Sequence, residues 1–143
     1  MKKLIGRREK ITLPEWNLKN VTGKIDTGAY TSSIHCEYVE EKEEGGKKVL
    51  FFKVLEPSDK KYNGKILRSE NYSQKKVKNS FGHAEIRYKV TTKVIMFGVE
   101  FDAEFTLTDR SKMRNPILLG RKILIGRFIV DVQEVNLSKK SLK

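Results

Sequence analysis

The chain has 143 residues, and 30 Lys+Arg against 18 Asp+Glu give it a formal net charge of +12 at neutral pH. This length favours one domain over residues 1–143, with an expected core at about 5–132 and a basic tail at 133–143. Its 38% hydrophobic and 34% charged residues indicate a globular chain, and no apolar run approaches the roughly 20 residues of a membrane helix. A single cysteine, Cys36, excludes an internal disulfide framework, so we expect a cytoplasmic protein without a membrane partner.

Five segments rich in Val, Ile, Phe, Tyr and Thr predict β-strands, which in chain order are 21–25, 48–55, 84–97, 99–107 and 127–132. The glycines within 44–47 and at Gly98 predict tight hairpins. Residues 118–125 predict a short helix that ends at Gly126. The polar segment 56–82 is either a long functional loop or a set of hairpins whose register the pattern does not fix. Together these signals predict an all-β barrel or sandwich with one short helix near the C-terminal end.

The charge is unevenly distributed along the chain. Residues 57–80 hold seven basic side chains against two acidic ones, whereas residues 37–44 hold five glutamates against one lysine. Patches of opposite sign on one small domain favour electrostatic steering of an acidic partner, although surface lysines also serve solubility alone.

The most informative stretch is Asp26-Thr27-Gly28-Ala29, which follows the apolar strand that ends at Ile25. Gly28 lets the backbone turn sharply and lets a substrate main chain approach closely, and Thr27 can hydrogen-bond within the turn. A carboxylate at the end of a rigid strand is well placed for acid–base chemistry, so Asp26 is the candidate catalytic group. The same residues are also compatible with an ordinary Asx turn after a strand.

A second motif, Leu118-Leu119-Gly120-Arg121, lies near the carboxyl end and leads into the expected short helix. In order and separation, this motif and Asp-Thr-Gly-Ala resemble the two signatures of retropepsin-like aspartic proteases. The resemblance implies a closed retropepsin-like barrel in which the apolar–Gly segment packs against the catalytic turn. It further implies a catalytic Asp26, a substrate-binding set of Thr27, Gly28 and Ala29, and a supporting set of Leu119, Gly120 and Arg121.

Residues 24–35, 106–113 and 116–131 are similar to the bacterial and archaeal family labelled "ATP-dependent zinc protease", which is associated with the ribosomal-protein glutamate ligase RimK. The sequence contains no His-Glu-x-x-His motif and no Gly-x-x-x-x-Gly-Lys-Ser/Thr loop, so we expect neither a metal nor a nucleotide cofactor. His35 and Cys36 are neighbours on a strand, and their side chains therefore point to opposite faces. Cys36 is a second candidate nucleophile, although a lone cysteine is more often a small buried hydrophobe.

Aspartic peptidases need two carboxylates that share one proton, and this chain has one Asp-Thr-Gly. A symmetric homodimer that joins Asp26 to its copy is the simplest completion, as in the retropepsins that the chain resembles. Asp109 is the in-chain alternative, although an aspartate after a strand also serves as a turn cap or pairs with a neighbour such as Arg110. In many retropepsins an acidic residue follows Asp-Thr-Gly-Ala and pairs with the arginine of Gly-Arg. Here that position is Tyr30, so Arg121 lacks this partner.

The sequence therefore predicts a homodimeric aspartic-type peptidase whose substrate is an acidic peptide or a glutamylated protein. RimK-type ligases build acidic glutamate tails, which a chain with a net charge of +12 would attract. Nucleic acid is the second choice of partner, since no helix-turn-helix, zinc-finger or RNA-binding aromatic motif is visible. The alternative function is a non-catalytic binding module of the same fold that docks on an acidic protein or RNA.

Overall fold

The computed structural model describes residues 1–78, 81–110 and 113–140. Residues 79–80 of the segment 56–82, 111–112 of the second family-like block and 141–143 of the expected tail lie outside this description. In chain order the elements are β1 (Lys3–Ile5), β2 (Arg8–Leu13), the 3-10 turn η1 (Pro14–Trp16), β3 (Leu18–Ile25), β4 (Ser32–Glu44), β5 (Lys47–Val54), β6 (Leu67–Ser69), β7 (Tyr72–Lys78), β8 (Ala84–Met96), β9 (Val99–Thr108), β10 (Ile117–Leu119), α1 (Arg121–Leu124), β11 (Phe128–Val130) and α2 (Leu137–Lys140).

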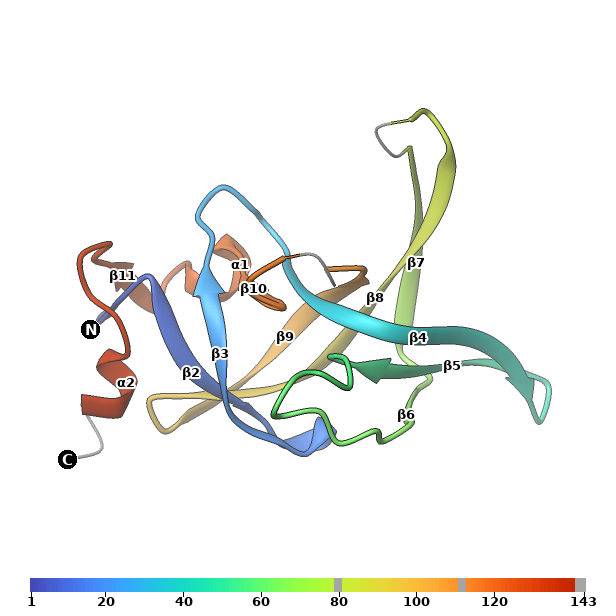
Figure 1. The fold of residues 1–143 in the computed structure, drawn as a ribbon, viewed down its shortest axis with the longest axis horizontal. Helices are drawn as coiled ribbons and strands as arrows, with labels where there is room; N and C mark the ends of the chain where they lie inside the picture. The colour runs from blue at the N-terminus through green and yellow to red at the C-terminus, as the bar shows by residue number, and fades with distance from the viewer. Residues whose placement is uncertain (79–80, 111–112, 141–143) are drawn as a thin grey trace.

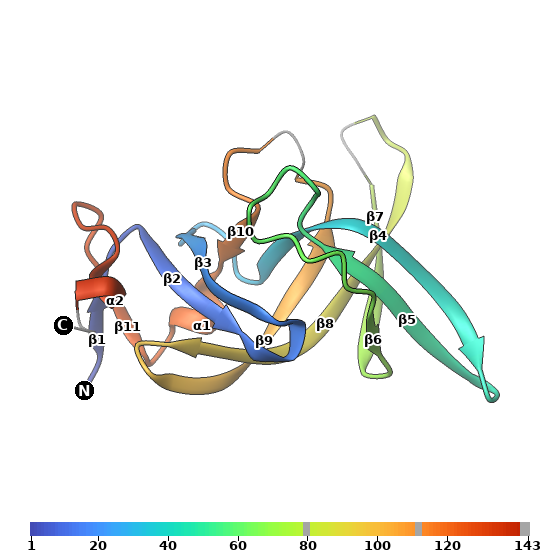
Figure 2. The ribbon, with the colours of Figure 1, turned by 60° about the horizontal axis from the view of Figure 1, so that its bottom comes forward.

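Six strands close into a barrel. Around the ring they follow the order β10, β3, β2, β8, β9 and β4, and β4 pairs back with β10. The β4–β5 and β7–β8 hairpins project from this barrel in different directions (Figure 1 and Figure 2). A separate sheet of two parallel strands, β1 and β11, lies near the chain ends. The predicted all-β closed barrel is thereby confirmed.

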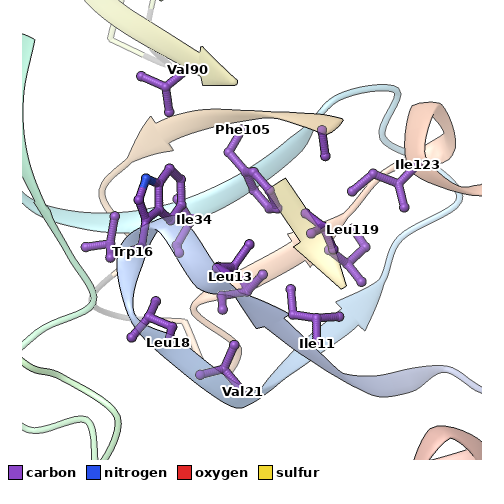
Figure 3. Close-up of a cluster of buried hydrophobic side chains, with 14 of the residues drawn as sticks. Ile11, Leu13, Trp16, Leu18, Val21, Ile34, Val90, Phe105, Leu119 and Ile123 are labelled. Carbon is purple, nitrogen blue, oxygen red and sulfur yellow. The ribbon is translucent and has the colours of Figure 1, made fainter. Parts of the chain in front are cut away.

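The core fills the barrel with side chains from its ring strands (Figure 3). The inner half of β9 buries every second side chain, as a strand with one face toward the core must do. Trp16 lies edge-on to Phe52 with ring centroids 5.6 Å apart, and it also contacts Phe105 at 5.8 Å. Leu119 of the second motif and Ile123 of the helix α1 that follows it belong to the same buried cluster. That motif is therefore anchored in the core.

The segment predicted as one helix, 118–125, divides into two elements. Residues 117–119 form the strand β10, and only Arg121–Leu124 are helical, as α1. The helix prediction was wrong for the first of these because β10 pairs in parallel with β3 and in antiparallel with β4, and tertiary pairing overrides local helix propensity. In the described part of the chain, no helix has the length and apolar character to cross a bilayer.

The hairpins predicted at 44–47 and at Gly98 are confirmed, with Gly45, Gly46 and Gly98 at positive φ. The acidic residues 37–44, which the sequence did not identify as a strand, form the outer part of β4. Four of their glutamates accept hydrogen bonds, in the pairs Tyr62–Glu37, Tyr38–Glu40, Tyr72–Glu41 and Arg68–Glu44. Hydrogen-bond partners, three of them from later segments of the chain, thus compensate the low strand propensity of glutamate.

The C-terminal segment packs against β2 through a buried carboxylate. Glu9 is fully buried and accepts hydrogen bonds from Gly6 N–H at 2.7 Å, Leu137 N–H at 3.1 Å, Ser138 N–H at 2.9 Å and Ser138 O–H at 2.7 Å. A side chain at Gly6 would overlap the backbone carbonyl of Glu134. The first part of the expected basic tail is therefore ordered against the barrel.

Candidate active site

Asp26 follows the last residue of β3 and begins a tight turn. Its backbone N–H donates to the Leu119 carbonyl at 2.9 Å, and its carbonyl accepts the Ala29 N–H at 3.2 Å. Its carboxylate Oδ1 accepts the Gly28 N–H at 2.9 Å, whereas Oδ2 has no hydrogen-bond partner among the described residues. Asp26 is half-buried, and Thr27 and Gly28 are exposed. The turn therefore orients the carboxylate and leaves one of its oxygens available.

The second motif and the start of α1 hydrogen-bond to the backbone of this turn. The backbone N–H of Arg121 donates to the Ala29 carbonyl at 2.8 Å, and that of Lys122 donates to the Tyr30 carbonyl at 2.9 Å. A Cβ at Gly120 would lie 2.7 Å from the Tyr30 carbonyl oxygen and 2.9 Å from that of Ala29, so only glycine permits this close approach. The two motifs, about 90 residues apart in sequence, are in direct contact because β10 lies between β3 and β4.

Arg121 has partners within its own chain. Its Nη1 donates to the Thr27 carbonyl at 2.9 Å, and its guanidinium lies 5.7 Å from the centre of the Tyr30 ring. A cation over an aromatic face is attracted to the ring electrons. Tyr30 thus gives the arginine a contact where many retropepsins provide a carboxylate, and Arg121 braces the turn from outside.

Sequence reasoning missed Ser32, the first residue of β4. Its buried Oγ accepts the Gly120 N–H at 2.9 Å, which ties the second motif to the strand after the turn. The available signal was a small hydroxyl residue at the start of a strand directly after the turn, where a buried N–H needs an acceptor.

Comparison with known proteins identifies the family of this fold and site. Residues 4–141 match the RimB-like family, described as retropepsin-like aspartic endopeptidase RimB. The chain belongs to this family. The RimB-like fold also matches a solved protein of unknown function (DUF785) from Legionella pneumophila, with a TM-score of 0.76 and 27% identity over 96% of this chain and 99% of that chain.

Two curated relatives are named probable alpha-L-glutamate ligase. The one from Desulfotalea psychrophila is 29% identical over 130 residues, which are 91% of this chain and 28% of that protein. The one from Shewanella pealeana is 30% identical over 133 residues, which are 92% of this chain and 29% of that protein. This RimB-like chain therefore spans less than a third of the length of these ligases.

Asp109, the in-chain alternative for the second carboxylate, lies beside His35. Its Oδ1 is 3.8 Å from His35 Nδ1, whereas the Asp26 carboxylate hydrogen-bonds, among the described residues, to Gly28 alone. His35 is buried, and its Nδ1 accepts the Arg110 N–H at 2.8 Å. The neutral ring then carries its proton on Nε2. The RimB-like chain thus uses this histidine to join β4 to the end of β9.

Cys36 is not placed for nucleophilic or metal chemistry. Its Sγ donates to the Tyr38 carbonyl at 3.0 Å, and burial raises the pKa of the thiol to about 11, so the group is protonated at neutral pH. Within the described ranges, no group of three or more His, Cys, Asp or Glu side chains is arranged to hold a metal ion.

Proposed function

We propose that this chain is an aspartic-type peptidase that hydrolyses peptide bonds through a dyad formed by Asp26 of two copies. The main observation behind this proposal is the state of the Asp26 carboxylate. Its Oδ1 accepts a hydrogen bond from the Gly28 N–H, and its Oδ2 accepts none from the described residues, on an exposed turn. Each copy supplies one of the two carboxylates that peptide hydrolysis of this type needs. Membership of a family of aspartic endopeptidases supports this reaction class.

In the dyad, two nearby carboxylates share one proton because two like charges at short distance repel. The ionised carboxylate takes a proton from a water molecule, whose oxygen forms a bond to the scissile carbonyl carbon. The protonated carboxylic acid gives its proton to the carbonyl oxygen. On collapse of the tetrahedral gem-diol, one hydroxyl returns its proton to the dyad as the carbonyl re-forms. The C–N bond breaks, and the departing amine takes up a proton from the dyad.

The dimer that brings the two Asp26 side chains together needs an apolar contact surface. The exposed apolar side chains Leu4 and Ile129 lie opposite each other in the β1–β11 sheet, at 47% and 55% exposure. Ile125, which follows α1, is 65% exposed, and α1 itself is hydrogen-bonded to the Asp26 turn. These exposed apolar side chains support pairing of two copies, because burying them stabilises an interface.

The state of association tests the dimer directly. We expect Ile129→Lys to shift the protein toward monomer in analytical ultracentrifugation and to reduce hydrolysis in parallel, because a lysine at a dimer contact must be desolvated. Ile66→Lys is the matched control, since Ile66 is 58% exposed on the segment before β6 and should keep both properties. A wild-type chain that cleaves peptides as a strict monomer would contradict the shared dyad.

We infer that the substrates are acidic, glutamate-rich tails. Two observations support this class: the longer relatives are named probable alpha-L-glutamate ligase, and this chain carries a net charge of +12. Peptides that end in ten glutamates or ten glutamines, incubated at about 50 and about 300 mM NaCl, separate charge from length. We expect faster cleavage of the glutamate peptide and a larger loss of that rate at high salt. Equal, salt-independent cleavage would remove the acidic substrate.

A further inference from the structure

A pocket of about 410 Å³ lies on the flank of the barrel, outside the Asp26 turn. Its walls come from three separate parts of the chain: β2 with β3, the loop after β5, and the segment before β10. Figure 2 shows that loop and that segment on the same side of β3. The cationic side chains in its lining are Arg8, Lys10, Lys60, Lys61 and Arg114, and we call this site the basic pocket.

The basic pocket holds unpaired positive charge. Five cationic side chains meet one carboxylate, Asp59, whose Oδ1 accepts the Lys61 backbone N–H at 2.8 Å. Across the described residues, none of the five cations is in an ion pair, and Lys10 Nζ instead donates to Thr22 Oγ1 at 2.6 Å. Gathering like charges in a hollow raises the local potential and attracts anions. The site is therefore suited to a ligand with several negative charges.

The chemistry of the lining favours carboxylates of a peptide over a nucleic acid strand. No aromatic side chain lines the pocket among the described residues, whereas surfaces for single strands usually stack the bases on aromatic rings. The cations are instead combined with short polar groups such as Thr22 and Asn115. Arginine can bind a carboxylate through two parallel hydrogen bonds, and lysine adds a point charge.

The position of the pocket relates it to the catalytic turn. Thr22 lies on β3 four residues before Asp26, a distance of about 13 Å along an extended strand. The pocket wall at Asn115 continues directly into β10, whose Leu119 carbonyl binds the Asp26 backbone. An extended peptide that reaches from the pocket to the turn therefore spans about four residues.

We propose that the basic pocket is an exosite that binds an acidic peptide segment about four or more residues away from the bond that Asp26 cleaves. Its link to cleavage rests on the proposed peptidase function, whereas its capture of acidic peptide does not. The pocket places the recognition of glutamate carboxylates on residues outside the Asp-Thr-Gly turn. The basic pocket then recognises the charge of the substrate, and the Asp26 turn cleaves its peptide bond.

The test measures binding of a fluorescein-labelled decaglutamate peptide to the full chain that carries Asp26→Asn, by fluorescence anisotropy. The pocket variant combines Lys60→Gln, Lys61→Gln and Arg114→Gln, all exposed positions. We expect its Kd to rise about tenfold at low salt, as loss of three partly screened charge contacts predicts. The control variant combines Lys2→Gln, Lys19→Gln and Lys47→Gln, which are exposed, lie outside the pocket and remove the same charge. We expect its Kd to change less than about twofold.

Three outcomes would overturn the exosite, of which the third depends on hydrolysis. Equal weakening in both triple variants would assign the attraction to net charge, and tighter binding of a ten-nucleotide RNA that the pocket variant alone loses would assign the pocket to nucleic acid. The peptidase proposal is judged separately, by hydrolysis with Asp26 intact. If hydrolysis is absent while the pocket variant still loses binding, the exosite stands and the peptidase fails. If hydrolysis occurs and the pocket variant keeps both its Kd and its KM, the exosite fails and the peptidase stands.

Discussion

Two carboxylates on neighbouring strands of the barrel have opposite surroundings. Glu9 on β2 is fully buried and accepts four hydrogen bonds, whereas Asp26 at the end of β3 is half-buried and accepts one, from Gly28. All the donors to Glu9 come from the chain ends, namely Gly6 and the segment that begins α2. The donor to Asp26 comes from its own turn.

This difference separates a carboxylate that stabilises the fold from one that can take part in acid–base chemistry. A carboxylate with every oxygen occupied stabilises the fold and has no lone pair left for a substrate, and removal of such a partner leaves buried donors unsatisfied. A carboxylate oriented by one hydrogen bond, with its second oxygen free, can exchange protons with water and substrate. Substitutions at the two positions should therefore act on different properties of the protein.

The largest expected effect is the loss of hydrolysis in Asp26→Asn. The amide keeps the size of the side chain and its oxygen for the Gly28 N–H, but it cannot take or give the proton of the dyad. We expect the hydrolysis rate to fall by about 10²–10⁴-fold, the range for loss of a general acid–base group. The free energy of unfolding, measured with guanidinium chloride, should change by less than about 0.5 kcal/mol.

Asp131 provides a matched control for this experiment. It follows β11 and its Oδ1 accepts the Gln133 N–H at 2.9 Å, the same local hydrogen bond that Asp26 makes with Gly28. Asp131→Asn should therefore keep wild-type hydrolysis. An equal loss in both variants would mean that turn geometry, and not the Asp26 carboxylate, determines the rate.

Glu9→Gln should give the opposite result. The glutamine places an NH₂ group among four donors, so at least one buried hydrogen bond to a charged acceptor is lost without replacement. We expect the free energy of unfolding to fall by about 3 kcal/mol, with hydrolysis unchanged at temperatures where the variant is folded. Glu43→Gln, at an exposed position of β4, is the control and should stay within about 0.5 kcal/mol of wild type. An unaltered Glu9→Gln stability would show that these contacts contribute little to folding.

The sequence allowed prediction of the features that are local or that resemble a family. The β-branched and aromatic composition of 99–107 identified β9, the glycines within 44–47 and at Gly98 identified hairpins, and the two motifs identified the retropepsin-like barrel. Features that depend on distant partners were missed. β10 is a strand because β3 and β4 flank it. The acidic part of β4 pairs with β5, and tyrosine and arginine side chains from later segments reach its glutamates.

The candidate site shows the same division. Asp26, Gly120 and Arg121 were identified by motif, but the role of Ser32 depends on a contact across 88 residues. The basic side chains counted at 57–80 also do not form one continuous patch in the structure. Arg68 from that stretch binds Glu44, while Lys60 joins cations from the start of the chain in the basic pocket. Charge counted along a sequence does not distinguish cations that are neutralised from those that are free to bind.

The smallest expected effect concerns Glu41, a partly buried carboxylate on β4. It accepts the Tyr72 hydroxyl, and burial, followed by this hydrogen bond, raises the pKa of Tyr72 from 10.0 to about 12. Tyr72→Phe removes the hydrogen bond, and at about pH 8 we expect the free energy of unfolding to fall by about 1 kcal/mol.

The pH dependence of this difference has a defined sign. The folded chain keeps the Tyr72 proton between its unfolded pKa of 10.0 and its folded pKa of about 12, so the unfolded chain binds fewer protons in this window. The stabilising contribution is complete below the unfolded pKa and is lost as pH rises toward the folded pKa. Guanidinium chloride unfolding at about pH 8 and about pH 11 should therefore show a smaller gap between wild type and Tyr72→Phe at the higher pH. A gap that stays constant would mean that Tyr72 titrates alike in the folded and unfolded states.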